Sequence, residues 1–345
     1  MKRFFKKLGL FLLIATLVVG FLAGNVIFAE EKWPTRSISV ICFSSAGGGT
    51  DTWNRAVAAE MQGILGVPIT VTNMTGGRGG VAASYVWDHP HDGYLVLGAS
   101  ETLLLLPTNA AHPTTAKEWE FFIAAGAPGC ICVRADSPYK TFQEFVDYAK
   151  SHPGDISISN SGMGKLWHMK AAMMDLYAGV KFKHIPYKGS HPAIVACVAG
   201  ETNAVVASVG EVFSFVKAGK LRPLVMTEPE SFLFKGYGKV PAITDFFPQL
   251  KQYLPLNQWL GYMLPADTPK YVLDKFASAF EEALKSDKIK NLANTRMEKI
   301  YGLTGAKAKE FALKMQSRLC WTQYRMGFSR VPPEKCGIPK PSEVK

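Results

Sequence analysis

Short apolar runs alternate with longer amphipathic stretches over most of this chain. The runs SISVICF at residues 37–43 and YLVLGAS at residues 94–100 are short, apolar and bounded by polar or glycine-containing segments, as strands are. Between them, TDTWNRAVAAEMQGIL at residues 50–65 spaces its apolar residues as one face of a helix does. Strands and helices that alternate in this way are typical of βαβ units, so the pattern predicts an α/β protein with mostly parallel sheets.

The alternation runs through two consecutive parts of the chain. In the first part we expect strands at 37–43, 68–74 and 94–100, with helices at 50–65 and 80–89. In the second part we expect strands at 130–135, 155–162, 182–189, 203–210 and 221–227, with helices at 141–152, 166–179, 191–200 and 211–220. After a loop-rich segment, a further strand is expected at 259–267 and long helices from 268 onward. The pattern therefore predicts two α/β units in series, followed by helical material.

The N-terminal segment has a different pattern. Four cations at Lys2, Arg3, Lys6 and Lys7 precede an apolar run, and small Ala29 stands before a polar segment. This order predicts a secretory signal peptide over residues 1–29, cleaved near Ala29. An uncleaved anchor helix is the alternative, because the run approaches the lower length limit for spanning a bilayer. We expect the mature chain to be soluble and exported, to the periplasm or another extracytoplasmic space.

Composition and charge narrow the class of partner. The 345 residues are 48% hydrophobic and 19% charged, which allows one large or two medium domains with buried cores. The formal charge of +11 falls to +7 once the four cations of the signal peptide are removed. A moderately basic exported protein suits anionic small molecules or an anionic membrane surface. Nucleic acid is not an expected partner, because the chain lacks a run of Lys/Arg interleaved with aromatic residues.

Two glycine-rich turns follow predicted strands. They read SSAGGGTD at residues 44–51 and NMTGGRGGVA at residues 73–82. Glycines let backbone N–H groups approach a ligand closely, and the start of a helix offers unpaired N–H groups with partial positive charge. Such a turn favours an anion. Tight turns without a ligand are the alternative, but two of them in one unit favour a site beyond the carboxyl ends of the strands.

An enzyme is a distant alternative class. Gly77, Gly79 and Ala82 fit the G-x-G-x-x-A pattern of dinucleotide-binding proteins, with Glu101 at the end of the next strand. A lone match is weak, and this one follows the second strand rather than the first. A hydrolase would need a nucleophile beside a base, and Ser161 and His168 are separated by a Gly-Met-Gly turn. We therefore expect a protein that is not an enzyme, without cofactor or metal.

The six cysteines have two expected roles. Cys42, Cys130 and Cys132 lie in apolar runs and are expected to be small buried side chains. Cys320 and Cys336 flank a polar, proline-containing segment near the C-terminus. Because export permits disulfides, we expect a bridge between these two cysteines.

Seven segments together carry a resemblance to a known family. Read in order along the chain, they resemble the substrate-binding proteins of tripartite tricarboxylate transporters, also called the Bug family, from Trp33 to about Met315. The segments are WPTRSISVICFSSAGGGTDTWNRAVAAEM, VTNMTGGRGGVAASYV, HDGYLVLGAS, SPYKTFQEFVDYAKSHPGDISISNSGMG, HIPYKGSHPAIVACVAGETNAVVAS, GKLRPLVMT and WLGYMLPADTPK.

The resemblance implies a two-domain, Venus-flytrap fold of the type II periplasmic binding-protein class. Domain one would comprise residues 33–130 plus 257–345, and domain two residues 131–256. A small carboxylate would bind between the domains and pass to a membrane permease of two subunits. The carboxylate could be a di- or tricarboxylate, an acidic amino acid or an aromatic acid. A ligand-loaded sensor that docks on a receptor kinase is an alternative that the sequence leaves open.

The resemblance also implies a binding site, residue by residue. Backbone donors of the first glycine-rich turn would hold one carboxylate, partly through ordered waters. The expected ligand-binding residues are Phe43, Ser44, Ala46, Gly47, Gly48, Thr50, Asp51, Gly77, Gly79, Gly80, Ser100, Glu101, Ser161, Gly164, Lys165, Tyr187 and Ser208.

Five positions depart from the family pattern, namely Arg78, Val81, Glu101, Lys165 and Leu166. Arg78 either adds a cation at the mouth of the site or points to solvent, and we expect solvent. Lys165 either pairs a second carboxylate or is an exposed lysine. Glu101 would repel a carboxylate unless it accepts a hydrogen bond from a hydroxyl or amine of the ligand, or pairs with a cation.

Overall fold

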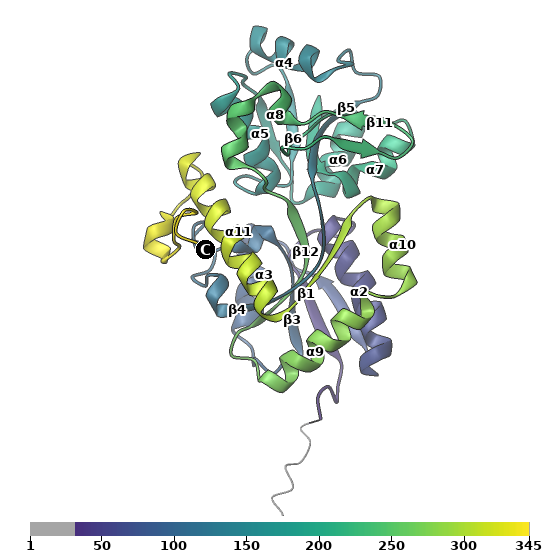
Figure 1. The fold of residues 1–345 in the computed structure, drawn as a ribbon, viewed down its shortest axis with the longest axis vertical. Coiled ribbons are helices and arrows are strands. Elements are labelled where there is room, and N and C mark those ends of the chain that lie inside the picture. The colour runs from purple at the N-terminus through teal and green to yellow at the C-terminus, as the bar shows by residue number, and fades with distance from the viewer. Residues whose placement is uncertain (1–31, 345) are drawn as a thin grey trace, which may run out of the picture. The chain divides into compact units, whose positions relative to one another are not determined.

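The computed structural model describes residues 32–344. The predicted signal peptide and its cleavage position at Ala29 lie outside the described residues. Within the unit Pro34–Lys345, the described strands form a six-stranded sheet, a five-stranded sheet and a small hairpin (Figure 1). Among residues 32–344, none of the helices combines the length and apolar character needed to cross a membrane.

The first sheet has the strand order β13-β4-β12-β3-β1-β2. Strand β1 pairs in parallel with β2 and β3, whereas β12 pairs antiparallel with both β3 and β4, and β13 antiparallel with β4. The strands are β1 (Ile38–Cys42), β2 (Ile69–Asn73), β3 (Leu95–Ser100), β4 (Trp119–Ala127), β12 (Gln258–Pro265) and β13 (Lys299–Leu303).

The second sheet has the order β7-β6-β8-β5-β9. Strand β6 pairs in parallel with β7 and β8, and β5 pairs antiparallel with β8 and β9. The strands are β5 (Gly129–Arg134), β6 (Ser157–Asn160), β7 (Lys183–Pro186), β8 (Ala204–Ser208) and β9 (Leu221–Met226). The segment that follows forms the hairpin of β10 (Phe232–Phe234) and β11 (Gly238–Val240), the short helix α8 (Ile243–Phe246) and a 3₁₀ turn at Pro248–Tyr253.

The α/β class is confirmed, but the expectation of mostly parallel sheets is wrong, because both sheets are mixed. Parallel pairing is confined to strands joined by the predicted helices. Strands β4, β5 and β12 carry the chain from one sheet to the other and back, so no βαβ crossover fixes their direction. The sequence analysis also missed β4 and β13.

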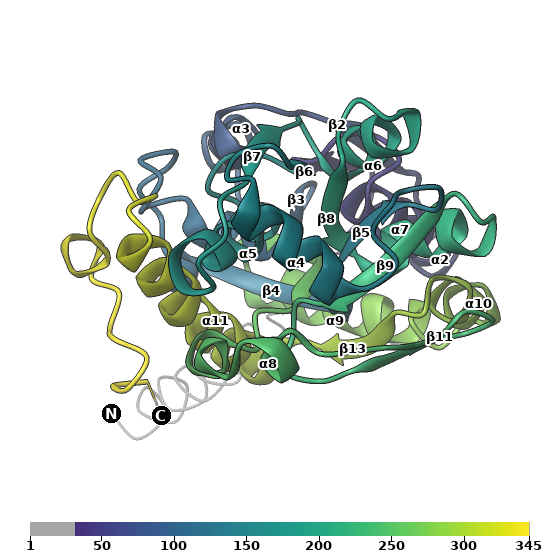
Figure 2. The same cartoon turned by 90° about the horizontal axis from the view of Figure 1, so that it is seen from above.

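The helices lie close to their predicted ranges and divide between the sheets (Figures 1 and 2). Helix α2 packs on β2, β12 and α9, and α11 packs on β4. Thr141 and Glu144 form a capping box at the start of α4, with Thr141 Oγ1 accepting from the Glu144 N–H at 3.2 Å. The helices are α2 (Gly49–Leu65), α3 (Gly80–Trp87), α4 (Phe142–Ser151), α5 (Leu166–Tyr177), α6 (Ser190–Ala199), α7 (Val209–Lys217), α9 (Lys270–Ala283), α10 (Asp287–Arg296) and α11 (Gly305–Arg325).

Both faces of the second sheet are buried along β5 and β8. Along β5, Cys130 and Cys132 pack into one hydrophobic cluster, while Ile131 and Val133 pack into the other. Successive side chains of a strand point to opposite faces. This arrangement explains why β5 and β8 are nearly continuous apolar runs rather than alternating ones.

The cysteine predictions have mixed outcomes. Cys42, Cys130 and Cys132 are buried and free, as expected. The expected bridge between Cys320 and Cys336 is wrong, because both are free thiols. The Cys320 thiol lies in the core and donates to the Leu104 carbonyl at 3.4 Å, whereas Cys336 is only half-buried in the 3₁₀ turn Pro333–Cys336.

Candidate functional site

The parallel strands of each sheet end in the turns that the sequence singled out. In the first sheet, β1, β2 and β3 run in the same direction and lead into the first turn (residues 43–48), the second turn (residues 75–79) and Glu101. In the second sheet, β6 and β7 lead into the third turn (residues 161–165) and the fourth turn (residues 187–189). Each set of turns therefore lies at the carboxyl edge of its sheet, where α/β proteins bind ligands.

The two sets of turns face each other. A Cβ placed on Gly189 in the fourth turn would overlap the Ser45 hydroxyl in the first turn. A Cβ placed on Gly47 would lie 3.6 Å from the ring of His191. The chain thus brings the turns of both sheets into contact, although more than 100 residues separate them in sequence.

A cavity of about 280 Å³ lies between these turns, and we call it the cleft cavity. Five residues from the expected site line it, two from the first sheet and three from the second: Phe43, Gly79, Ser161, Lys165 and Tyr187. Arg78 and Lys188 also line the cavity, so the cations around it come from both sheets. Arg78 is half-buried, which differs from the expected solvent-facing position.

Lys165 is a cation of the cleft cavity that lacks an ion-pair partner among residues 32–344. Its ammonium lies 5.6 Å from the centre of the Phe43 ring, a cation–π contact between the two sides. Burial lowers the pKa of Lys165, and the charge of Glu101 opposes that shift. An anionic group in the cavity would remove this desolvation penalty.

Glu101 is a buried acid near Lys165 and is only 2% exposed. Its Oε1 accepts from the Thr102 hydroxyl at 3.2 Å, whereas Oε2 is buried without a hydrogen-bond partner in the described residues. Burial, the largest cause, raises the pKa of Glu101 to about 7. At neutral pH this carboxyl is therefore partly protonated and can either donate or accept a hydrogen bond.

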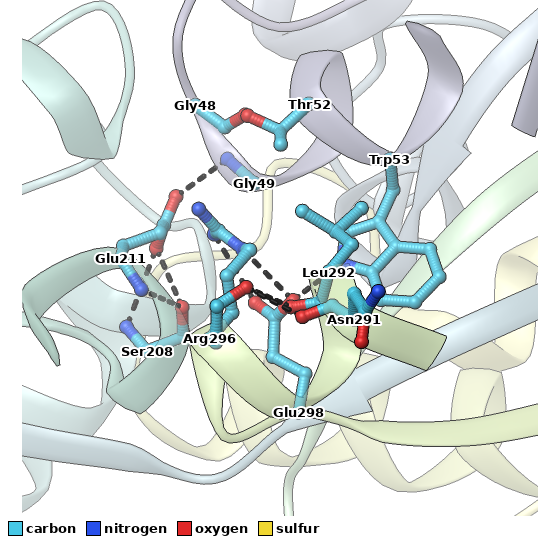
Figure 3. Close-up of polar contacts among 11 residues, drawn as sticks. Gly48, Gly49, Thr52, Trp53, Ser208, Glu211, Asn291, Leu292, Arg296 and Glu298 are labelled. Carbon is cyan, nitrogen blue, oxygen red and sulfur yellow. Dashed lines mark hydrogen bonds and ion pairs between the residues drawn. The ribbon is translucent and has the colours of Figure 1, made fainter. Parts of the chain in front are cut away.

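Backbone N–H groups of the first turn and of the start of α2 donate hydrogen bonds to carboxylates of the chain itself. The Gly47 N–H donates to Asp51 Oδ2 at 2.9 Å, and the Gly49 N–H at the start of α2 donates to Glu211 Oε1 at 2.9 Å (Figure 3). Asp51 Oδ1 also accepts from Arg55 Nε at 2.9 Å and from Asn73 Nδ2 at 2.8 Å, which fixes the shape of the turn. The positive end of α2 thus behaves as an anion site, with Glu211 as its observed occupant.

Glu211 is a residue that the sequence analysis missed. The signal was present, because Ser208 and Glu211 match the S-x-x-E capping box before an apolar helix. Ser208 Oγ donates to Glu211 Oε2 at 2.9 Å and accepts from the Glu211 N–H at 3.3 Å (Figure 3). Ser208 therefore caps α7 and holds the carboxylate that reaches across to α2.

A second buried acid lies next to this contact. Glu298 accepts from the indole N–H of Trp53 on α2 and pairs with Arg296 Nε at 2.9 Å (Figure 3). A Cβ on Gly210 would overlap the Glu298 carboxylate, so α7 approaches this acid closely. Burial raises the pKa of Glu298 despite the nearby Arg296 guanidinium.

The second turn needs its glycines for packing. Gly77 and Gly79 have φ values of 53° and 95°, in the region that favours glycine. A Cβ on Gly80 would overlap the backbone carbonyl of Ala111. Gly77 and Gly80 line a different cavity beside the cleft.

The remaining expected residues shape the turns rather than line the cleft cavity. Ser100 Oγ accepts from the Thr102 N–H at 3.4 Å, and the Ser44 carbonyl accepts from Asn73 Nδ2 at 2.9 Å. The Gly164 N–H donates to His168 Nδ1 at 3.1 Å. A ligand-binding role for these residues, and for Ala46, Gly48 and Thr50, stays a prediction.

Comparison of the sequence with known proteins identifies one family. The family described as "Tripartite tricarboxylate transporter family receptor" matches residues 53–317. A UPF0065 protein from the gbd 5′ region of Cupriavidus necator is 30% identical over 83% of this chain and 86% of its own length.

Solved structures agree on the fold. One described as a periplasmic transporter is 27% identical, with a TM-score of 0.76 over 86% of this chain and 98% of its own. MatC from Rhodopseudomonas palustris with bound malate is 22% identical, with a TM-score of 0.72 over 85% of this chain and all of its own. These likenesses confirm the two-sheet, periplasmic binding-protein fold that the sequence predicted.

Proposed function

This chain belongs to the family of tripartite tricarboxylate transporter receptors, and from that premise we propose that it captures a small carboxylate in the cleft cavity. The observation that carries the proposal is the Lys165 ammonium, which lines this cavity without an ion-pair partner among residues 32–344. A charge-assisted hydrogen bond from Lys165 to a ligand carboxylate would supply the missing partner.

Glu101 does not itself line the cleft cavity, but its charge acts on Lys165, and we propose that a ligand beside Lys165 also reaches Glu101. Its unpartnered Oε2 lies in a buried environment that keeps the carboxyl partly protonated. In its protonated form Glu101 would donate to a carboxylate, and in its charged form it would accept from a hydroxyl. A hydroxy-dicarboxylate satisfies both Lys165 and Glu101, and the malate-bound neighbour with the same fold supports that class.

The two sheets would close on the ligand as two domains. We propose domain one as residues 33–130 plus 257–345 and domain two as residues 131–256, because the first sheet draws its strands from 38–127 and 258–303. The chain passes between the sheets at Pro128 and again between β9 and β12. Two such crossings form a hinge, and a ligand that contacts both sides favours the closed state.

The partner and location follow from the family. We propose that the chain is exported after cleavage near Ala29 and delivers its ligand to a membrane permease of two subunits. A binding role without catalysis is supported by His168, whose Nδ1 already accepts a backbone hydrogen bond and whose pKa burial lowers to about 4. The sensor that docks on a receptor kinase is the second candidate, which genes for a neighbouring kinase rather than a permease would favour.

The test is a ligand screen followed by calorimetry on the exported chain. Malate, succinate, citrate, glutamate, sugars and NAD are screened by thermal shift, and the best ligand is titrated. A ligand at a hundred times its Kd adds about 2.7 kcal/mol of stability. Lys165→Gln should weaken carboxylate binding by about tenfold or more. The control is Lys183→Gln, an exposed lysine on β7. The proposal fails if sugars or NAD shift the protein and no carboxylate does.

A further inference from the structure

A second cavity of about 590 Å³ lies beside the cleft cavity, and we call it the arginine chamber. It is lined by Arg78 from the second turn, Arg330 from the segment after α11, and Asn109 between them in sequence. Ser84 and Tyr85 of α3 contribute further polar groups. Among the described residues that line the chamber, none is acidic.

Arg78 is half-buried and Arg330 is exposed, and no acid among the described residues that line the chamber neutralises either charge. Neither Arg78 nor Arg330 makes an ion pair within the part of the chain that the structure describes. Burial and the charge of Arg330 both lower the pKa of Arg78. Two like charges that face one chamber repel each other until an anion lies between them.

A buried donor in the chamber also lacks a partner. Asn109 is 1% exposed, and its Oδ1 accepts from Arg78 Nη1 at 2.8 Å and from Gln323 Nε2 at 3.0 Å. Because Oδ1 takes both donors, Nδ2 remains a buried N–H group without a hydrogen-bond partner in the described residues. Buried amide donors are usually paired in native structures, so this N–H group is available to an acceptor from outside the chain, such as a water molecule or an anion.

The backbone holds these groups in place. The N–H groups of Arg330 and Val331 both donate to the Thr108 carbonyl, at 2.8 and 3.0 Å, which ties the C-terminal segment to the loop that carries Asn109. Arg78 has a φ of 58° and Ala110 a φ of 51°, a conformation that side chains other than glycine adopt at a cost. Such strain tends to persist at binding sites.

We infer that the arginine chamber is a second anion-binding site, which takes a compact, negatively charged oxyanion group between Arg78, Arg330 and Asn109. Guanidinium groups bind phosphate and carboxylate oxygens in pairs, and the unpartnered Asn109 Nδ2 adds a neutral donor. The oxyanion group is either a free anion or the far acid of a polycarboxylate whose other end lies in the cleft cavity. Arg78 lines both cavities, which allows either source.

The test uses inorganic phosphate and citrate as probes on the exported chain, by isothermal titration calorimetry in a buffer free of both. Arg330→Gln removes one cation, and its matched control is Arg325→Gln, an exposed arginine that lines neither cavity. If the source is a free anion, phosphate binds, and Arg330→Gln but not Arg325→Gln weakens it by about tenfold or more. Phosphate has no carboxylate group, so this arm does not depend on the proposed function.

The second arm rests on the proposed function. If the source is the far acid of a polycarboxylate, Arg330→Gln weakens citrate by about tenfold but leaves succinate unchanged. The inference is overturned if phosphate does not bind and citrate is insensitive to Arg330→Gln. It is equally overturned if Arg325→Gln and Arg330→Gln weaken either probe to the same extent, because that result reports net charge only.

Discussion

At the scale of single residues, buried charge distinguishes this chain. Glu101, Lys165 and Lys170 are ionisable side chains near the junction of the two sheets, and burial shifts the pKa of each toward the neutral form. Sequence alone marked Glu101 and Lys165 as departures from the family pattern, but it could not say that Glu101 is buried. Because burial raises its pKa, the Glu101 side chain can be protonated at neutral pH. It can then donate a hydrogen bond to a carboxylate that its charged form would repel.

The raised pKa of Glu101 predicts a pH-dependent stability. Because the folded chain holds this proton up to about pH 7, the stabilisation is complete below the unfolded pKa and is lost as the pH rises through 7. The free energy of unfolding of the wild type, relative to Glu101→Gln, should fall between pH 5 and pH 7 by at most about 1.4 kcal/mol per unit. Urea denaturation at several pH values measures this difference. Glu334→Gln, an exposed acid, is the control, and a parallel pH profile for both variants would contradict the prediction.

Gly80 should be intolerant of any side chain. Its φ of −61° suits alanine, so only the overlap of a Cβ with the Ala111 carbonyl opposes the change. We expect Gly80→Ala to lower the free energy of unfolding by about 1–3 kcal/mol.

Gly63 in α2 is the matched control, because a Cβ there meets nothing within 4 Å. Gly63→Ala should stabilise the chain by about 0.5–1 kcal/mol, since alanine is the better helix former. Thermal or urea unfolding of both variants checks the opposite signs. Equal effects would mean that the second turn relaxes around the added methyl group.

At the scale of elements, an ion pair and its hydrogen bonds join a helix of the second sheet to the segment that returns to the first sheet. Lys170 on α5 pairs with Glu228, which follows β9, and also donates to the Thr227 carbonyl at 2.9 Å. Glu228 Oε2 accepts from the Leu256 N–H at 3.2 Å, just before β12. This network ties α5 to the return crossing between the sheets.

Breaking this pair on one side should be costly. Lys170→Met leaves the Glu228 carboxylate buried without its cation, which typically costs about 3–5 kcal/mol. Adding Glu228→Gln removes the charge but keeps an acceptor for Leu256, so the double variant should recover much of the loss. A double-mutant cycle by urea denaturation measures the coupling. Additive losses would show that the two side chains do not stabilise each other.

At the scale of the whole molecule, the contact between Glu211 and Gly49 joins the two sheets directly. Together with the cation–π contact of Lys165 on Phe43, it holds the turns of both sheets around the cleft cavity. These contacts span the junction between the two sheets, so an opening of the cleft would break them.

Ligand binding should therefore make the molecule more compact on average. In the proposed mechanism the ligand-free chain samples open states, and a carboxylate that contacts both domains shifts the population toward the closed one. Small-angle X-ray scattering of the exported chain with and without the ligand measures the radius of gyration, which should fall on binding. Lys165→Gln at the same ligand concentration should show a smaller fall. A radius that is identical in both states would exclude closure.

The sequence by itself determined the local structure. The ranges of the helices, the strands β1–β3 and β5–β9, the capping boxes and the glycine-rich turns all follow from periodicity and short-range chemistry, which neighbouring residues encode. The sequence also identified the family, because few families share this ordered set of segments. The capping box of Ser208 and Glu211 was readable in the same way but was not used.

The tertiary structure alone decided which of these residues meet. Glu211 reaches Gly49 across 162 positions, Arg330 joins Arg78 at one chamber, and Cys320 turns into the core away from Cys336. The antiparallel placement of β4 and β12 likewise depends on how the chain crosses between sheets. Such contacts depend on packing between distant segments, and burial then fixes the protonation of Glu101 and the unpaired charge of Lys165, which no local pattern encodes.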